Sequence, residues 1–506
     1  MSSECTFTQP SPLDIPELLH LIASYLYKSD IALCLRVSPM WYQAFLPVLW
    51  TELDLFLDPD GYKGPLLLES RKMWPLVRKL YVDCEGNFKM SCGAIRFSNL
   101  THLKVVQYIL QHGSRSPLRN ERSLVTLIKR HHSTLRDFDS NSDTSTHILQ
   151  ALSKCTQLEK LKLEHQYLRR MEDWMELYES LWSRLESLSF TGTFQFESTS
   201  EDIATDAMAM TTFLNKGETI IKELDLRLGG WSEQVVRSIH ILLLMKSPKL
   251  IRLQLTYFDD PISTLLKIAQ MAPFGQHLKE LRLHGADMGN KDMQELLQRL
   301  PELERFEATN SFMSIELLRS LRTDTPQFLT TFKVLKLVAI TEGSGELAQN
   351  IMTSMPCLEE LVLDHITDVD IKSDGGRWIC TGLKKLTIAI VLLEKGTEDM
   401  VMELVASLEN LTKLNLNENY YGEVPAPVGG RMEDYEPKLS LDHGLGRLKA
   451  LHRLEEFTPP EHHVQWTERE ASWVLKYWVK MRNLTVNANR EALDLLEQNP
   501  RIHVCW

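Results

Sequence analysis

The apolar residues follow one short pattern along most of the chain: apolar, two residues, apolar, one residue, apolar. Leu278-Lys-Glu-Leu281-Arg-Leu283 is one copy, and Leu358-Glu-Glu-Leu361-Val-Leu363 is another. Side chains alternate between the two faces of a β-strand, so the last two apolar positions of each copy share a face. Each copy therefore predicts a short strand with Leu281 or Leu361 toward a core, and with Arg282 or Val362 on the opposite face.

Between these strands the apolar spacing becomes helical. Met293, Leu296, Leu297 and Leu300 fall at i, i+3, i+4 and i+7 ahead of Pro301, which predicts a helix before the next strand. A single strand–helix unit cannot bury its own leucines, so the units must stack. The pattern thus predicts an α/β fold with a parallel, concave sheet on one side and helices on the convex side.

The pattern has sixteen copies, at a mean spacing of about 29 residues, and resembles the leucine-rich repeat, whose period is ~20–29 residues. An ordinary α/β sheet with a chance motif would not give such regular intervals. The chain departs from the family at the Asn or Cys position, where only Asn419 and Asn489 match. The central apolar residues are Leu53, Leu80, Leu103, Phe138, Leu161, Leu188, Leu224, Leu253, Leu281, Phe306, Leu335, Leu361, Leu386, Leu414, Leu454 and Leu484.

Three intervals between copies are long, and they predict long loops near 107–133, 191–220 and 420–447. The last contains closely spaced Pro and Gly residues, which interrupt regular structure. It is either a tolerated insertion or a loop that binds a partner, because recognition residues concentrate on such loops. We expect a solenoid over 51–506, a different unit over 13–50 and a flexible N-terminus over 1–12.

Residues 13–50 lack the repeat and predict three short helices. Pro16 begins the first, with an apolar stripe at Leu18, Leu19, Ile22 and Leu26. Ser29 is the expected N-cap of a second helix over 30–37. Ser38 should cap a third, with Pro39 at its first position and Trp41 on its apolar side. So short a unit must dock on a partner or on its neighbour to be stable.

The same residues resemble the F-box motif. From Glu17 the match needs no gap: Glu-Leu-Leu-x-x-Ile-x-x-Tyr-Leu, three residues, Asp-Ile, five residues, Val-Ser-x-x-Trp. The family usually opens Leu-Pro-x-Glu, whereas here Leu13 lies one residue early and Pro16 directly precedes Glu17. The motif is followed at once by the repeats, so the chain as a whole resembles F-box proteins with leucine-rich repeats.

The resemblance implies a role. F-box helices bind a Skp-type adaptor, which links to a cullin–RING ubiquitin ligase of the SCF type, and the repeats capture a protein substrate. The alternative for the apolar stripe is a cap on the first repeat, since a solenoid end needs one. The adaptor-binding residues that the resemblance implies are Leu13, Pro16, Glu17, Leu18, Leu19, Ile22, Leu26, Ile31, Val37 and Trp41.

Charge and composition narrow the function classes. The net charge is −12, whereas binding to the phosphates of nucleic acid needs a basic face. We therefore expect no nucleic-acid partner. The eight cysteines include no CxxC pair, and the first residues have no secretory signal, which predicts reduced thiols in the cytoplasm or nucleus. No apolar run approaches the ~20 residues of a membrane span.

No motif for catalysis, a metal or a cofactor is found in the sequence. His131-His132 and His462-His463 are adjacent pairs, which do not give the i, i+4 spacing of two ligands on one helix face. We therefore expect a non-catalytic ligase subunit without cofactors, whose ubiquitin chemistry resides in other subunits. The alternative is a protein-binding scaffold or inhibitor without a ubiquitin link. The expected substrate-binding residues are Tyr257, Phe258, Arg282, Phe312, Tyr420 and Tyr421.

Overall fold

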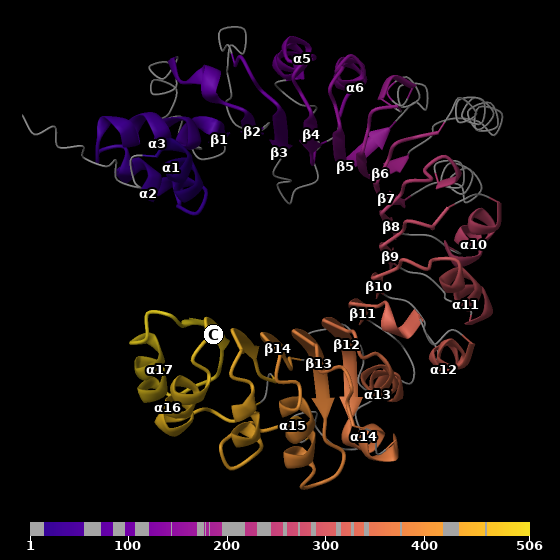
Figure 1. The fold of residues 1–506 in the computed structure, drawn as a ribbon, viewed down its shortest axis with the longest axis vertical. Coiled ribbons are helices and arrows are strands. Elements are labelled where there is room, and N and C mark those ends of the chain that lie inside the picture. Colours follow the sequence, from indigo (N-terminus) through magenta and orange to yellow (C-terminus); the bar gives the residue numbers. More distant parts are fainter. Residues whose placement is uncertain are drawn as a thin grey trace, which may run out of the picture. The chain divides into compact units, whose positions relative to one another are not determined.

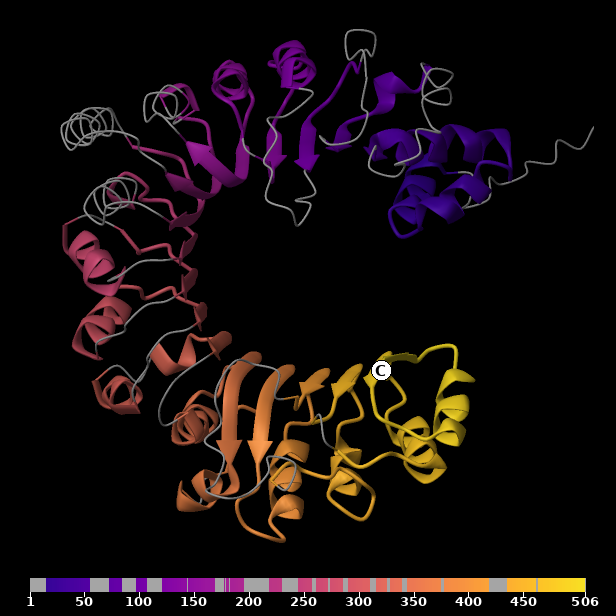
Figure 2. The same cartoon turned by 180° about the vertical axis from the view of Figure 1, so that it is seen from behind.

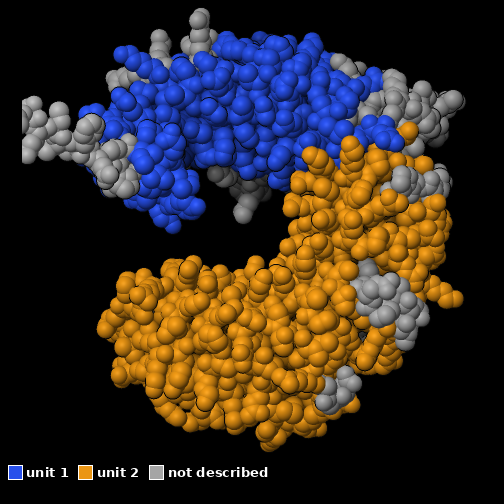
Figure 3. Space-filling model, in the orientation of Figure 1, with its two compact units in different colours: residues 1–221, 228–235 blue, residues 222–227, 236–506 orange. Residues whose placement is uncertain are grey.

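The fold is described from a computed structural model. It describes residues 15–54, 72–83, 97–106, 121–142, 144–168, 177, 179–181, 183–194, 218–229, 244–256, 261–271, 274–284, 290–309, 315–324, 328–338, 344–374, 377–417, 435–460 and 463–505. The chain divides into two compact units (Figure 3). The first unit comprises residues 1–221 and 228–235, and the second comprises residues 222–227 and 236–506.

The first unit begins with three helices, which we call the helical segment (residues 15–51). They are α1 (Pro16–Ala23), α2 (Lys28–Cys34) and α3 (Pro39–Thr51). Ser38 caps α3 as predicted, because its side chain accepts a hydrogen bond from the Trp41 backbone N–H. The prediction that Ser29 caps α2 is wrong. Tyr27 is the N-cap, and its carbonyl accepts from the amides of Asp30 and Ile31, so Ser29 lies inside the helix.

Six parallel strands follow in the first unit. Their central apolar residues are in register, from Leu53 beside Leu80 to Leu161 beside Leu188. Helix α5 lies within the segment 107–133 that was expected to be a loop, because Leu124, Leu127 and Ile128 give it a buried face. The elements are β1 (Glu52–Asp54), η3 (Trp74–Leu76), β2 (Lys79–Asp83), β3 (His102–Val106), α5 (Glu121–Arg130), β4 (Asp137–Ser140), α6 (Thr146–Ser153), β5 (Lys160–Leu168) and β6 (Ser187–Phe194).

The second unit continues the strand–helix alternation. Its strands are β7 (Glu223–Gly229, of which 223–227 belong to this unit), β8 (Arg252–Thr256), β9 (Glu280–His284), β10 (Arg305–Thr309), β11 (Val334–Val338), β12 (Glu360–Thr367), β13 (Lys385–Val391), β14 (Lys413–Asn415), β15 (Glu456–Thr458), β16 (Asn483–Thr485) and β17 (His503–Cys505). Its helices are α10 (Pro261–Met271), α11 (Asn290–Gln298), α12 (Ile315–Asp324), η4 (Phe328–Thr330), α13 (Ser344–Ser354), α14 (Asp368–Asp374), α15 (Glu398–Ala406), η6 (Leu445–Ala450), α16 (Glu468–Tyr477) and α17 (Arg490–Glu497).

In the second unit the strands line one side and the helices cover the other (Figures 1 and 2). All its strand pairs are parallel, and each central apolar residue lies beside the next, as Leu281 does beside Phe306. Backbone hydrogen bonds also join successive strand starts. For example, the Glu304 amide donates to the Lys279 carbonyl at 3.0 Å, and the Lys333 amide to the Glu304 carbonyl at 2.8 Å.

Two details of the second unit correct the predictions. Strand β15 is centred on Phe457 rather than on Leu454, because Leu454 is the first apolar residue of that copy and lies buried in the turn before the strand. Val362 shares a face with Lys336, as predicted, but it is buried rather than open to solvent. The prediction for the core holds, because Leu281 and Leu361 are fully buried. A single continuous solenoid over 51–506 stays a prediction.

Candidate interaction sites

The helical segment has a small core of its own. Leu19, Ala23, Ile31, Ala44 and Phe45 are buried together. The rings of Trp41 and Phe45 stack with centroids 5.2 Å apart. The half-buried side chains of Ile22, Leu26 and Trp41 pack against this core. The buried residues come from all three helices, so this core fixes the backbone that carries the outward-facing residues.

Large apolar side chains are concentrated on the outer surface of the same segment. Among the described residues, nine of the thirteen large apolar side chains that are exposed to solvent lie between residues 15 and 42. They come from all three helices and from the turns between them. We call these nine residues the apolar surface: Ile15, Leu18, Leu21, Tyr25, Tyr27, Leu33, Val37, Met40 and Tyr42.

The residues predicted to bind an adaptor thus fall into three groups. Pro16, Glu17, Leu18 and Val37 are exposed and available for contact. Ile22, Leu26 and Trp41 are half-buried, while Leu19 and Ile31 are buried in the segment's core, where they support the surface instead of contacting a partner. Leu13 lies outside the described residues. The predicted set did not include Leu21, Tyr25, Tyr27 or Leu33, although Leu21 lies in α1 and Tyr25 in the turn that directly follows it.

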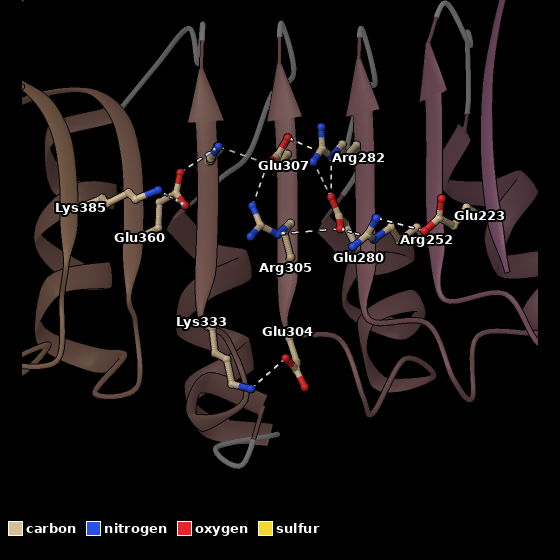
Figure 4. Close-up of polar contacts among 11 residues, drawn as sticks. Glu223, Arg252, Glu280, Arg282, Glu304, Arg305, Glu307, Lys333, Glu360 and Lys385 are labelled. Atoms are coloured by element: carbon tan, nitrogen blue, oxygen red, sulfur yellow. Dashed lines mark hydrogen bonds and ion pairs between the residues drawn. The ribbon is translucent and has the colours of Figure 1, made fainter. Parts of the chain in front are cut away.

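A second site lies on the strand face opposite the leucine core in the second unit. Cross-strand register places alternating charges there, and ion pairs connect them from β7 to β13 (Figure 4). We call these residues the charged face: Glu223, Arg252, Glu280, Arg282, Arg305, Glu307, Lys336, Glu360 and Lys385.

The contacts of the charged face form a chain across neighbouring strands. Arg252 lies between Glu223 and Glu280, at 3.1 Å from each carboxylate. Arg282 in turn bridges Glu280 at 2.5 Å and Glu307 at 3.2 Å. Farther along, Lys336 lies 3.4 Å from Glu307 and 2.9 Å from Glu360. Each interior member therefore has a partner on two sides, so its orientation is fixed before any ligand arrives.

One carboxylate of this face, Glu360, is held in its ionised form. Burial opposes ionisation of Glu360, but the hydrogen bond from Lys336 and the charges of Lys336, Lys385 and Arg305 outweigh burial and hold the pKa of Glu360 below its usual value. Glu360 is therefore negatively charged at neutral pH.

Of the predicted substrate-binding residues, the structure places only Arg282, in the middle of the charged face. Tyr257, Phe258, Phe312, Tyr420 and Tyr421 lie outside the described residues, as do 107–120, 195–217 and 420–434 of the predicted loops. Within the described ranges, no group of three or more His, Cys, Asp or Glu side chains is placed to hold a metal ion. None of the helices in the part of the chain that is described is long and apolar enough to cross a membrane.

Comparisons with known proteins find a distant likeness among solved structures alone. No model of a known protein family matches the sequence, and no curated protein matches it. Among solved structures, the chain is similar to one from the crystal structure of the Rad7 and Elc1 complex in yeast, with 12% sequence identity and a TM-score of 0.36. The likeness covers 97% of this chain and 92% of that one. A likeness this distant transfers neither a function nor a partner.

Proposed function

We propose that this protein is a non-catalytic substrate receptor of an SCF-type ubiquitin ligase. In this proposal the helical segment binds a Skp-type adaptor, and the repeats hold a protein substrate. The observation that carries it is the apolar surface: nine exposed apolar side chains within 28 residues, on a segment that also fits the F-box pattern from Glu17 to Trp41.

Exposed apolar side chains in such density support an interface. Apolar side chains scattered singly over a surface are ordinary, but a contiguous patch is uncommon on a monomer and usually marks a binding site. Outside residues 15–42, the described part of the chain exposes only Val369, Ile379, Leu393 and Val479 among its large apolar side chains. The helical segment therefore differs from the rest of the chain in the way expected of a partner-binding surface.

The repeats support the second half of the proposal. Stacked strand–helix repeats present an extended face on which a partner can lie. The charged face provides such a surface, built on regular strands and covered by ionised side chains. Regular strands hold side chains more rigidly than loops do, which suits a recognition surface.

The proposal is tested by measuring binding of a purified Skp-type adaptor to the full chain. Val37 is the best position to perturb, because its side chain is 61% exposed and is not part of the segment's core. Val37→Asp places a charge in the apolar surface, and burying that charge in an interface is costly. We expect the affinity to fall at least about tenfold, which corresponds to about 1.4 kcal/mol.

Val479→Asp is the matched control, since Val479 is 62% exposed and lies between α16 and β16, far along the chain from the helical segment. This variant should bind the adaptor as the wild type does. Ile22→Asp is a poorer probe, because Ile22 packs on the segment's core and its loss would disturb folding. A wild-type chain that does not bind the adaptor, or a Val37→Asp variant that binds with unchanged affinity, would refute the proposal.

A scaffold without a ubiquitin link is the second candidate, and one observation favours it. Helix α3 runs directly into β1, and the Lys28 ammonium donates to the Glu52 carbonyl at 3.2 Å, so the helical segment also covers the start of the first unit's sheet. A cap of this kind would be present in a scaffold as well. The adaptor-binding measurement separates the two candidates, because a cap alone does not bind the adaptor.

A further inference from the structure

The charged face exposes its two signs unequally. The side chains of Glu280, Glu307 and Glu360 are 12%, 16% and 17% exposed, whereas those of Arg282 and Arg252 are 42% and 59% exposed. These three carboxylates are less exposed than any of the five cations, whose side chains range from 31% to 59% exposed. Glu223, at the β7 end of the face, is the exception, with 44% of its side chain exposed. A partner approaching the face therefore meets cations first.

The face also differs in net charge from the whole chain. Its nine residues comprise four carboxylates and five cations, so it is slightly positive on a chain whose net charge is −12. The adjoining Asp225–Arg227 pair, 3.1 Å apart, leaves this balance unchanged. On an otherwise acidic chain, even a slightly positive face directs an anionic partner toward this sheet.

The half-buried carboxylates orient the more exposed guanidinium groups. Glu280 accepts from Arg282 Nε at 2.7 Å and also lies 3.1 Å from Arg252, so both side chains are fixed toward the same strand. Side chains that are already ordered lose less freedom on binding. A fixed guanidinium fork also matches the geometry of carboxylate and phosphate groups.

From these observations we infer that the charged face binds a carboxylate-rich segment of a protein partner, because singly charged carboxylates meet less repulsion from the interleaved glutamates than doubly charged phosphates would. This inference rests on the proposed role of the repeats in protein capture, and it specifies the chemistry of what they capture. Nucleic acid fits less well, because a continuous phosphate backbone would lie against the interleaved carboxylates and needs an uninterrupted row of cations.

The test uses the full chain and three short fluorescein-labelled peptides: alternating Glu and Ser, alternating Gln and phosphoserine, and alternating Gln and Ser. Fluorescence anisotropy should show binding of the Glu–Ser peptide, weakened by added salt, and at least about tenfold weaker binding of the neutral peptide. Tighter binding of the phosphoserine peptide than of the Glu–Ser peptide would overturn the assignment of a carboxylate-rich partner.

Two variants localise the binding. Arg252→Gln and Arg282→Gln should each weaken binding of the Glu–Ser peptide roughly tenfold. Each leaves Glu280 with the other arginine as a partner, so the network is not dismantled. Lys333→Gln is the control. Lys333 is also exposed and ion-paired, to Glu304 at 2.8 Å, but it lies before the start of β11, away from the charged face (Figure 4).

The control should bind the peptide as the wild type does, and all three variants should keep the wild-type melting temperature within a few degrees. Equal binding of charged and neutral peptides, an equal loss in Lys333→Gln, or tighter binding of an oligothymidylate than of either anionic peptide would overturn the inference. Adaptor binding is measured separately through Val37, so a chain that binds the adaptor but no anionic peptide refutes this inference alone.

Discussion

The helical segment and the second unit differ in how far their apolar side chains are buried. In the second unit, strands β7 to β13 each bury a central apolar residue and carry charge on the other face, as Leu281 and Arg282 do. The helical segment buries five residues and exposes nine large apolar ones. Both regions contain the same kinds of apolar side chain, and they differ in how these are buried. Each repeat packs against its neighbours, whereas three short helices are too small to bury all of their own apolar side chains.

The comparison predicts the largest loss of stability where a repeat core is opened. Leu281→Ala removes a fully buried side chain from the centre of β9 and should lower the free energy of unfolding by about 2–5 kcal/mol. Arg282→Ala, one residue away, removes a partly solvated ion pair and should cost less than about 1 kcal/mol. Thermal and urea denaturation of both variants would check this. Equal losses would mean that the two faces of the strand are not different.

The first unit contains a buried polar group whose effect depends on pH. His131 follows α5 and is buried near Phe97, with ring centroids 6.3 Å apart, and within the described residues its Nε2 atom has no hydrogen-bond partner. Burial, aided by the charge of Arg130, lowers the pKa of His131 to about 4. In the unfolded chain this pKa returns to about 6.5, so the unfolded state binds the proton more readily.

The contribution of His131 to stability is therefore fully present above pH 6.5 and is lost as the pH falls toward 4. The loss should reach about 3 kcal/mol when the pH is below both pKa values. His131→Phe should make the dependence of the unfolding free energy on pH shallower between pH 6.5 and 4, whereas substitution of the exposed neighbour, His132→Gln, should leave it unchanged. Parallel curves for the wild type and His131→Phe would contradict the assignment.

A smaller effect is expected in the helical segment. Ser38→Ala removes the side-chain oxygen that accepts from the Trp41 amide at 3.2 Å, and loss of such an N-cap costs about 0.5–2 kcal/mol. The loss should be confined to the segment, since Ser38 lies at the end of α3 opposite to the end that leads into β1. Hydrogen exchange would show faster exchange in α3 and unchanged exchange in β8–β13. Faster exchange throughout the chain would mean that the segment and the repeats unfold together.

Much of the repeat architecture follows from local sequence. The spacing of Leu278, Leu281 and Leu283 specifies a strand, its buried face and its register, because period-two alternation and stacking leave little freedom. The pattern gave a wrong centre for β15. Leu451 and Leu454 have the spacing of the first two apolar positions of a copy, so Leu454 was predicted as the centre, three residues before the observed centre at Phe457. Helix α5 could have been found from Leu124, Leu127 and Ile128, which have helical spacing within a segment expected to be loop.

The candidate sites follow from sequence only in part. The stripe of α1 is visible in the sequence, but its spacing does not say which side faces the segment's own core. Leu19 was therefore predicted to contact the adaptor, although it is buried in a core with Ala44 and Phe45, which lie far along the chain. The charged face depends on register between strands about 25–30 residues apart, such as Arg282 between Glu280 and Glu307. The sequence shows alternating positive and negative side chains at these positions, but it does not show which of them are less exposed to solvent.

The central claim is that a Skp-type adaptor buries the exposed apolar side chains of the helical segment, whereas the repeats bury theirs against one another. Hydrogen exchange of the full chain, with and without a saturating Skp-type adaptor, tests it most directly. We expect slower exchange in residues 15–42 on adding the adaptor, and no change in the strands and helices of the second unit. Unchanged exchange in residues 15–42, or protection confined to the repeats, would contradict the claim.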